Sequence, residues 1–273
     1  MADNRRFESA RLRVLTELER QRHGLGMQKE KKLHAIFKDY EDPNSDHQEI
    51  PVVGSYIADI FNGSEIVEIQ NGNFGKMRDK LCAYLPQYPV RIVYPIPHCK
   101  WITWIDPDTG EQRGRRRSPR KGTIYDAVPE LFRIRSYLED PHLTIDLCLT
   151  DMVEYRLQDG WGRDGKRGSH RYDRIPTAIV HELRIRDKSD YLAFVPPDLP
   201  EPFTAAQMAA AAGQPGRAFS DTALLLTELG ILNRIGKRGH AYLYRIGDAF
   251  READATKKLT EYNNTADHDS FKA

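Results

Sequence analysis

The sequence lacks the features that mark several large classes of protein. No run of about 18 apolar residues is present, which excludes a conventional membrane-spanning helix, and residues 1–8 lack the apolar stretch of a signal peptide. We therefore expect a cytoplasmic protein with no membrane partner. Net charge is also almost absent, at +1 from 41 basic and 40 acidic residues. Any binding of nucleic acid must then come from local clusters of charge.

Cysteine is scarce and carries no recognisable pattern. The three cysteines, Cys82, Cys99 and Cys148, are odd in number and have no close-spaced metal-binding arrangement. This is typical of buried, reduced thiols, so we assign them no chemistry. The 273 residues, of which 40% are apolar, suffice for one large domain or two modest ones.

The order of helical and strand-like patterns predicts an α/β protein with a small additional module. From the N-terminus we expect an amphipathic accessory helix, an α/β domain, a basic glycine-rich linker, a helix-turn-helix with a wing, and a polar tail. These segments cover residues 1–26, 27–156, 157–200, 201–248 and 249–273. Within them we expect strands over residues 90–95 and 143–149, a helix over residues 124–138, and Leu224 in the core of the C-terminal module.

Two strand-like runs in the α/β domain place acidic residues on facing positions. Residues 55–60 and 66–70 are joined by an Asn-Gly turn, which readily adopts the positive φ angles of a tight reversal. Because strand side chains alternate between faces, Glu68 and Gln70 point the same way. If the two runs pair, Asp59 and Glu68 converge with the Gln70 amide beside them.

This arrangement predicts a site for a hard divalent cation. Carboxylate oxygens are the ligands that magnesium prefers, so Mg²⁺ or Mn²⁺ is the expected ion at Asp59 and Glu68. Glu30 lies on the inward side of a helix predicted over residues 28–40 and would add a third acid. Gln70 would orient the attacking water. His34, one helical turn after Glu30, either contacts phosphate or is ordinary hydrogen-bonded packing, and we favour packing.

A purely structural interpretation of the acids stays open. In that interpretation Asp59 caps the turn beside Asn62, and Glu68 pairs with Lys31 or Lys80 across an edge strand. One such coincidence is common in proteins. Two acids together with an inward glutamate in this order of elements favour the metal site.

The order of a helix with Glu, a strand, a strand with Asp, a strand with Glu-x-Gln, a helix and a strand resembles the PD-(D/E)XK nuclease superfamily. The resemblance covers residues 28–155, and an uncharacterised bacterial family with the same Glu-Ile-Gln segment is similar. It implies a restriction-endonuclease-like mixed sheet flanked by helices, followed here by a small C-terminal winged-helix domain. It also implies that Asp59 and Glu68 bind metal, Glu30 is the helix-borne acid and Gln70 occupies the usual lysine position.

The glutamine departs from the common pattern, because an amide cannot offer positive charge to a developing oxyanion. Lys76 and Lys80 lie one turn apart on the next predicted helix, and either would compensate as a migrated lysine. The alternative is that both belong to a solvated helix face.

Two basic clusters predict contacts with nucleic acid. The first lies beside Trp101 and Trp104, which suits phosphate contact and base stacking, although a solvated loop or an acidic protein partner remains open. The second lies in the wing, whereas the would-be recognition helix over residues 220–229 offers no side chain suited to reading base edges. The residues concerned are Arg115, Arg116, Arg117, Arg120 and Lys121 in the first cluster, and Lys237 and Arg238 in the second.

Together these patterns predict a metal-dependent nuclease, most naturally a DNA endonuclease. Two alternatives stay open: a catalytically inactive binding or regulatory protein that works through its winged helix, and an enzyme that acts on RNA. The sequence leaves open whether the protein forms a homodimer.

Overall fold

The computed structural model describes residues 3–22, 32–160, 168–215 and 217–251 and divides the chain into two compact units. The first unit contains residues 1–130 and 142–184, and the second contains residues 131–141 and 185–273. Within the described ranges, no helix has both the length and the apolar character needed to cross a bilayer.

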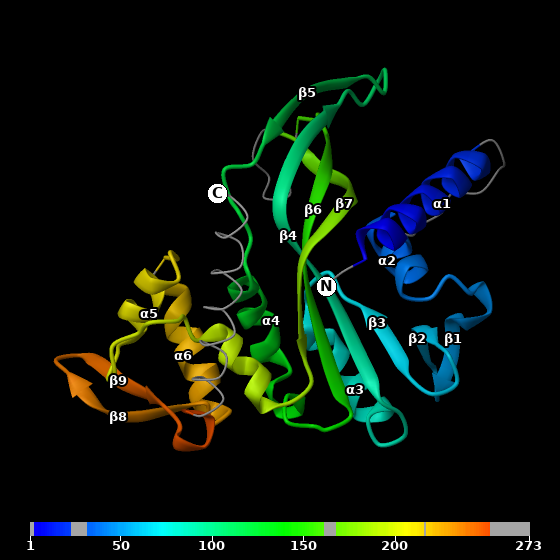
Figure 1. The fold of residues 1–273 in the computed structure, drawn as a ribbon. Helices are drawn as coiled ribbons and strands as arrows, with labels where there is room; N and C mark the ends of the chain where they lie inside the picture. Colours follow the sequence, from blue (N-terminus) through cyan, green and yellow to red (C-terminus); the bar gives the residue numbers. More distant parts are fainter. Residues whose placement is uncertain (1–2, 23–31, 161–167, 216, 252–273) are drawn as a thin grey trace, which may run out of the picture. The chain divides into compact units, whose positions relative to one another are not determined.

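A seven-stranded mixed sheet forms the centre of the first unit (Figure 1). Strands follow one another in the order β1-β2-β3-β4-β6-β7, and β5 pairs with β4 off this path. Pairs β1/β2, β2/β3 and β4/β5 are antiparallel, whereas β3/β4 and β4/β6 are parallel. The strands are β1 (Gln48–Val53), β2 (Tyr56–Phe61), β3 (Ile66–Ile69), β4 (Val90–Ile105), β5 (Gln112–Arg117), β6 (Leu143–Leu157) and β7 (His170–Ile185).

Helices cover both faces of this sheet, as expected for an α/β unit. One face carries α1 (Asn4–Arg22) and α2 (Lys32–Glu41), whose apolar stripes pack on alternate residues of the strands. Val67 and Ile69 of β3 belong to that core, so the intervening Glu68 points to the opposite face. There it meets α3 (Arg78–Tyr84), which follows the short η2 (Phe74–Met77).

The sheet is larger than the sequence predicts. The strand expected to end at residue 95 continues to Ile105, and the strand expected over residues 143–149 continues to Leu157. The linker expected over residues 157–200 is wrong for its central part, because residues 170–185 form β7 at one edge of the sheet. Pairing with neighbouring strands supplies the hydrogen bonds that keep these polar segments in strand conformation. Local sequence propensity does not predict such pairing.

The remaining short elements also differ in detail from the sequence pattern. The long helix expected over residues 124–138 is broken into η3 (Ile124–Ala127), α4 (Val128–Arg133) and η4 (Arg135–Tyr137). A further turn, η1 (Ser45–His47), precedes β1. Of the expected polar tail, residues 252–273 lie outside the described residues.

The second unit has the helix, helix and hairpin order that the sequence predicts. After η5 (Lys188–Phe194) come α5 (Ala205–Ala211), α6 (Arg217–Glu228), the antiparallel strands β8 (Leu232–Arg238) and β9 (Ala241–Ile246), and η6 (Asp248–Phe250). The capping box of Thr204 and Gln207 begins α5, and Gly230, with φ of +74°, ends the α6 segment. Leu224, expected in the core, is 37% exposed, whereas Leu225 and Leu226 are buried.

Candidate functional site

Asp59 and Glu68 lie on facing strands at the end of the β2/β3 pair. The antiparallel register joins Ile60 to Val67 and Phe61 to Ile66, and continuing it by one residue sets Asp59 opposite Glu68. Ile60 and Val67 both face the core under α1 and α2, so the two acids share the other face. The structure therefore brings together the two acids that the sequence singles out.

The Asp59 carboxylate lies between the two strands and takes the place of a backbone carbonyl in their hydrogen-bond ladder. Its Oδ2 accepts a hydrogen bond from the Ile69 backbone N–H at 2.7 Å, a group that a regular antiparallel ladder would pair with a carbonyl. The same oxygen lies 3.0 Å from Nε2 of His34 on α2. Asp59 is thereby held in place, and its side chain remains 14% exposed.

Lys80 of α3 holds the Glu68 carboxylate. Its ammonium donates to both carboxylate oxygens, at 2.7 and 2.9 Å, and to the Ile57 carbonyl at 2.7 Å. The Glu68 side chain is only 1% exposed, whereas that of Lys80 is 24% exposed, so the ammonium forms the outer wall of the site. Lys76, the other candidate lysine, is exposed and does not lie on the carboxylates.

The surroundings of Glu68 disfavour its charged form. Burial raises its pKa to about 7, with the nearby Asp59 carboxylate acting in the same direction, and together they outweigh the opposing effects of Lys80 and His34. A group in this state gives up its proton readily when a cation arrives. The site is thus arranged to gain from a further positive charge.

A buried tyrosine hydroxyl completes the surroundings of the acids. Tyr84 of α3 packs edge-on against Tyr56 at a centroid distance of 6.1 Å. Burial raises the pKa of its hydroxyl well above the ordinary range, and the charges of Glu68 and Asp59 add to the effect. Its oxygen is buried and has no hydrogen-bond partner in the described part of the chain. Such a group calls for an ordered water or a bound ligand.

Three further residues that the sequence singles out have different outcomes. Glu30 lies outside the described residues, so its position relative to the two acids is not defined. Gln70 is half-buried just after β3, and its backbone N–H donates to the Val93 carbonyl at 2.9 Å. His34, expected as hydrogen-bonded packing, lies within hydrogen-bond distance of Asp59. Its position one turn after Glu30 was the sequence signal for this contact.

The residues present fit a hydrated divalent cation. Asp59 and Glu68 offer hard oxygen ligands from adjacent strands, and the unpartnered Tyr84 hydroxyl suits a water of the kind that Mg²⁺ retains. Lys80 already holds both oxygens of Glu68, so an ion would share that carboxylate with the ammonium.

The first basic cluster is a strand of the sheet. β5 pairs with the far end of β4, so that the two form a hairpin arm (Figure 1). Side chains on both faces of the arm stack on tryptophans: Arg115 lies over the Trp101 ring at 4.9 Å and Arg116 over the Trp104 ring at 5.9 Å. One face of each ring is therefore already covered by an arginine.

The remaining members of this cluster differ in how they are held. Arg117 donates to Cys99 Sγ at 3.2 Å, and Arg120 pairs with Asp126 at 2.5 Å. Lys121 is exposed. The cluster thus contains stacked, tethered and exposed side chains.

The β8–β9 hairpin of the second unit, which the sequence analysis expects to form a wing, is basic and aromatic. Arg234 lies 3.8 Å from the centre of the Tyr242 ring, and the Lys237 ammonium lies 4.7 Å from it. Arg238 and His240 are exposed near the tip of the hairpin. The pairing of cations with one exposed aromatic ring was not apparent from the sequence, because Tyr242 lies on the opposite strand.

Comparison with known proteins places this chain among relatives. Residues 31–186, more than half of the chain, match the family described as "Domain of unknown function (DUF8091)". The chain belongs to this family. An "Uncharacterized protein" of Treponema pallidum (strain Nichols) is 27% identical over 215 residues, which are 78% of this chain and 84% of that protein. No solved structure matches.

The DUF8091 region contains both features of the first unit that carry chemistry. Its boundaries enclose His34, Asp59, Glu68 and Lys80 as well as the β4–β5 arm and β7. The helix, helix and hairpin segment falls beyond residue 186. The acids and the arm therefore lie within the matched residues, and the β8–β9 hairpin lies outside them.

Proposed function

We propose that this protein is a metal-dependent nuclease that hydrolyses phosphodiester bonds, most naturally in DNA. One observation carries the proposal: Asp59 and Glu68 face each other at the open end of a strand pair, with the Lys80 ammonium on Glu68. Two carboxylates and a lysine are the groups required to hold Mg²⁺ or Mn²⁺ and to offset the charge that develops on phosphate.

The topology around the acids supports a restriction-endonuclease-like interpretation. A helix, α2, precedes the antiparallel β1, β2 and β3, and α3 then connects β3 to the parallel β4. This is the order of elements on which the resemblance to PD-(D/E)XK nucleases rests. Lys80 reaches the acids from the helix, in the manner expected of a migrated lysine when Gln70 occupies the usual position.

Each residue of the site has a distinct proposed role. Asp59 and Glu68 would hold the ion, which would supply charge neutralisation of the phosphate and an acidified water. Asp59 is oriented by the Ile69 N–H and His34, so that its other oxygen is available. Lys80 would offer a proton donor and a positive charge beside the scissile phosphate. Gln70, one strand position beyond the core of β3, would orient the water.

The β4–β5 arm would hold the duplex. From Val93, beside the acids, to Ile105 at the end of β4 is 12 residues, or at most about 40 Å of strand. One turn of B-DNA is about 34 Å, so an arm of this length would reach phosphates about one turn from the cleaved bond. β4 pairs with β6 on its other side as far as Ile105, so β5 is the free edge of this arm, and its arginines on both faces suit contact with the phosphate backbones.

The second unit would add backbone affinity. Its helix, helix and hairpin order supports a winged-helix interpretation, and the cations around Tyr242 favour phosphate or minor-groove contact by the wing. Lys237 and Arg238 would contribute charge without reading sequence.

The proposal is tested with purified protein on supercoiled plasmid, single-stranded DNA and RNA, each with Mg²⁺ or Mn²⁺. We expect cleavage of DNA that requires the metal and that falls at least about 100-fold in Asp59→Asn, because loss of a metal ligand removes several kcal/mol of transition-state stabilisation. Asp79→Asn, which changes an exposed acid on α3, is the matched control and should cleave normally. Cleavage that persists in Asp59→Asn would rule out this site.

A second candidate, an inactive nuclease-fold protein that binds or regulates through its wing, is favoured by one contact. Lys80 engages both oxygens of Glu68 and so supplies the positive charge that a metal would otherwise bring. For this candidate we expect DNA binding without cleavage of any of the three substrates under either metal.

Arg115 and Arg116 provide a test of the arm that does not depend on catalysis. Each contact with a phosphate contributes about 0.9 to the slope of log affinity against log salt concentration. We expect Arg115→Ala and Arg116→Ala each to lower that slope by about 1, as measured by fluorescence anisotropy of a labelled duplex. Arg5→Ala, an exposed arginine of α1, should leave the slope unchanged, and equal slopes in all four proteins would exclude the arm as the DNA contact.

A further inference from the structure

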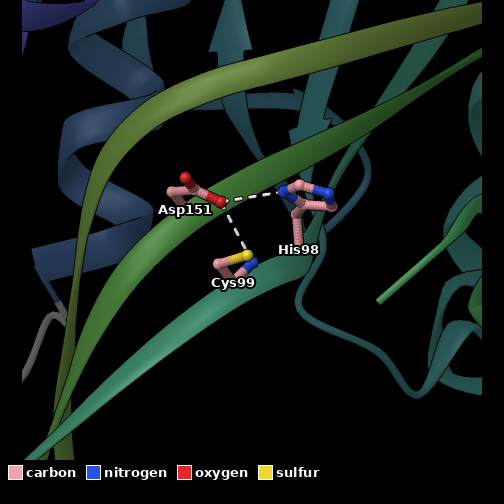
Figure 2. Close-up of side chains that lie close together, drawn as sticks. All are labelled: His98, Cys99 and Asp151. Carbon is pink, nitrogen blue, oxygen red and sulfur yellow. Dashed lines mark hydrogen bonds and ion pairs between the residues drawn. The ribbon is translucent and has the colours of Figure 1, made fainter. Parts of the chain in front are cut away.

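His98, Cys99 and Asp151 gather three different ligand atoms at one point of the sheet, away from the acids of β2 and β3. Figure 2 shows the three side chains pointing toward one another from β4 and β6. A ring nitrogen, the sulfur and a carboxylate oxygen lie within 4.8 Å of one another. Among the described residues, these three form the group of at least three His, Cys, Asp or Glu side chains whose ligand atoms lie this close together.

A β-bulge explains why two consecutive residues of one strand share this point. Pro97 pairs with Thr150 and Lys100 with Met152, so His98 and Cys99 together stand opposite the single residue Asp151. In a regular strand, neighbouring side chains point to opposite faces, and the extra residue of the bulge interrupts that alternation. Asp151 fastens the bulge, because its Oδ1 accepts from the Cys99 backbone N–H at 3.0 Å and lies 2.9 Å from His98 Nδ1.

We propose that this bulge binds a borderline transition-metal ion, with Zn²⁺ as the natural occupant. Imidazole, thiolate and carboxylate are all zinc ligands, and a tetrahedral site with bonds of about 2.0 to 2.3 Å places its ligand atoms about 3.3 to 3.6 Å apart. The His98–Asp151 separation of 2.9 Å is close to that value. Side-chain rotations that bring Cys99 Sγ onto the same centre complete three ligands, and water takes the fourth position.

The mixture of donors distinguishes this site from the acids of β2 and β3. Thiolate is a soft ligand that magnesium does not use, whereas Asp59 and Glu68 offer only hard oxygens. Asp151 and a metal-bound Cys99 thiolate carry two negative charges, which a divalent ion neutralises. Zinc uptake at the bulge is therefore expected to be independent of the proposed nuclease function.

One existing contact must be replaced when the ion binds. Arg117 donates to Cys99 Sγ at 3.2 Å, and its side chain is exposed, so it can turn into solvent without leaving a buried charge. The bulge lies where the β4–β5 arm begins. There the chain passes back beside β4 after β5, and the Gly122 backbone N–H donates to the His98 carbonyl at 2.9 Å. Binding of zinc would thus tie the root of the arm to β6 and release Arg117 toward solvent.

The test uses full-length protein stripped with EDTA and titrated with Co²⁺, whose thiolate complexes absorb by charge transfer in the near ultraviolet, and then with Zn²⁺. We expect one equivalent of Co²⁺ to produce this band, and Zn²⁺ to abolish it by displacement. Wild-type protein suffices for this measurement, so it does not depend on the folding of a variant. A protein without the charge-transfer band overturns the proposal.

Variants then assign the ligands. Asp151→Asn preserves shape and can still accept from Cys99 N–H, and Cys99→Ser changes one atom; each should weaken Zn²⁺ about 100-fold in a competition with a chelating dye. Cys82→Ser, at an exposed cysteine, and Asp59→Asn should bind zinc as the wild type does. A charge-transfer band that survives in Cys99→Ser and disappears in Cys82→Ser also overturns the assignment.

Discussion

Replacing Glu68 by Gln is expected to stabilise the metal-free protein by about 1 to 3 kcal/mol at pH 8 while it removes metal-dependent cleavage. The stabilisation and the loss of cleavage both follow from removing the negative charge of Glu68. Glu68 is fully buried beside a second carboxylate, and Lys80 offsets only part of the resulting cost. Glutamine has the shape of the protonated acid and can still accept from Lys80, but it brings no charge to a metal.

The pH dependence of this stability difference follows from the raised pKa of Glu68. Below about pH 4.5, Glu68 is protonated in the folded and unfolded states alike, so variant and wild type should be equally stable. Between pH 4.5 and about 7 the unfolded chain loses this proton and the folded protein retains it. Wild-type stability therefore declines relative to Glu68→Gln over that window, and the difference should be constant above about pH 7.

Urea unfolding in EDTA, followed by tryptophan fluorescence, measures this difference. Trp101 and Trp104 lie in the first unit, and residues 185–273 contain no tryptophan, so the signal reports on the unit that contains Glu68. Asp79→Asn is the control and should show no such pH dependence. A Glu68→Gln variant less stable than wild type at pH 8 would mean that the Lys80 ion pair outweighs burial, which would contradict the raised pKa.

The local chemistry of the site was accessible from sequence because it rests on short-range rules. An Asn-Gly turn between two alternating runs fixes their pairing, and the period of two in each strand then sets Asp59 opposite Glu68. Lys80 was one of two candidates, since Lys76 is a turn away on the same segment. The structure distinguishes them: η2 ends at Met77, so α3 begins after Lys76 and presents Lys80 to the strand.

The contacts that sequence could not supply join segments far apart in the chain. His98 and Asp151 are 53 positions apart, and only the β4/β6 register, with its bulge, brings them together. The extension of the sheet through β7 depends equally on pairing with β6. Both depend on hydrogen bonds between strands, and no pattern within one segment reports them.

A buried charge network holds this long-range pairing in register. Asp146 of β6 is fully buried and accepts from Arg184 of β7 at 2.6 and 2.7 Å and from Arg91 of β4 at 3.1 Å. Arg91 also pairs with Glu41 of α2 at 2.7 Å and with Glu65 at 3.3 Å. These anionic neighbours raise the pKa of Arg91, despite its burial, so it stays charged.

This arrangement defines the register of three strands. Arg91 pairs with Val67 on one side and Thr144 on the other and faces Glu41 of α2. A shift of one residue would turn its guanidinium to the opposite face, where Ile92 and Ile145 are buried, and away from Glu41 and Asp146. The network thereby fixes where β3 ends, and with it the position of Glu68 relative to Asp59. The positions of Asp59 and Glu68 therefore depend on charged groups that do not contact them.

Asp146→Ala is therefore expected to destabilise the first unit by about 3 to 5 kcal/mol, because it leaves two arginines without their shared buried partner. Glu8→Ala, which breaks the partly exposed pair with Arg11 within α1, should lower the free energy of unfolding by no more than about 0.5 kcal/mol. Urea unfolding by tryptophan fluorescence measures both. If Asp146→Ala lowers the free energy of unfolding as little as Glu8→Ala does, water must hydrate the two guanidinium groups in the variant. The register would then come from the apolar pattern of β4 and β6.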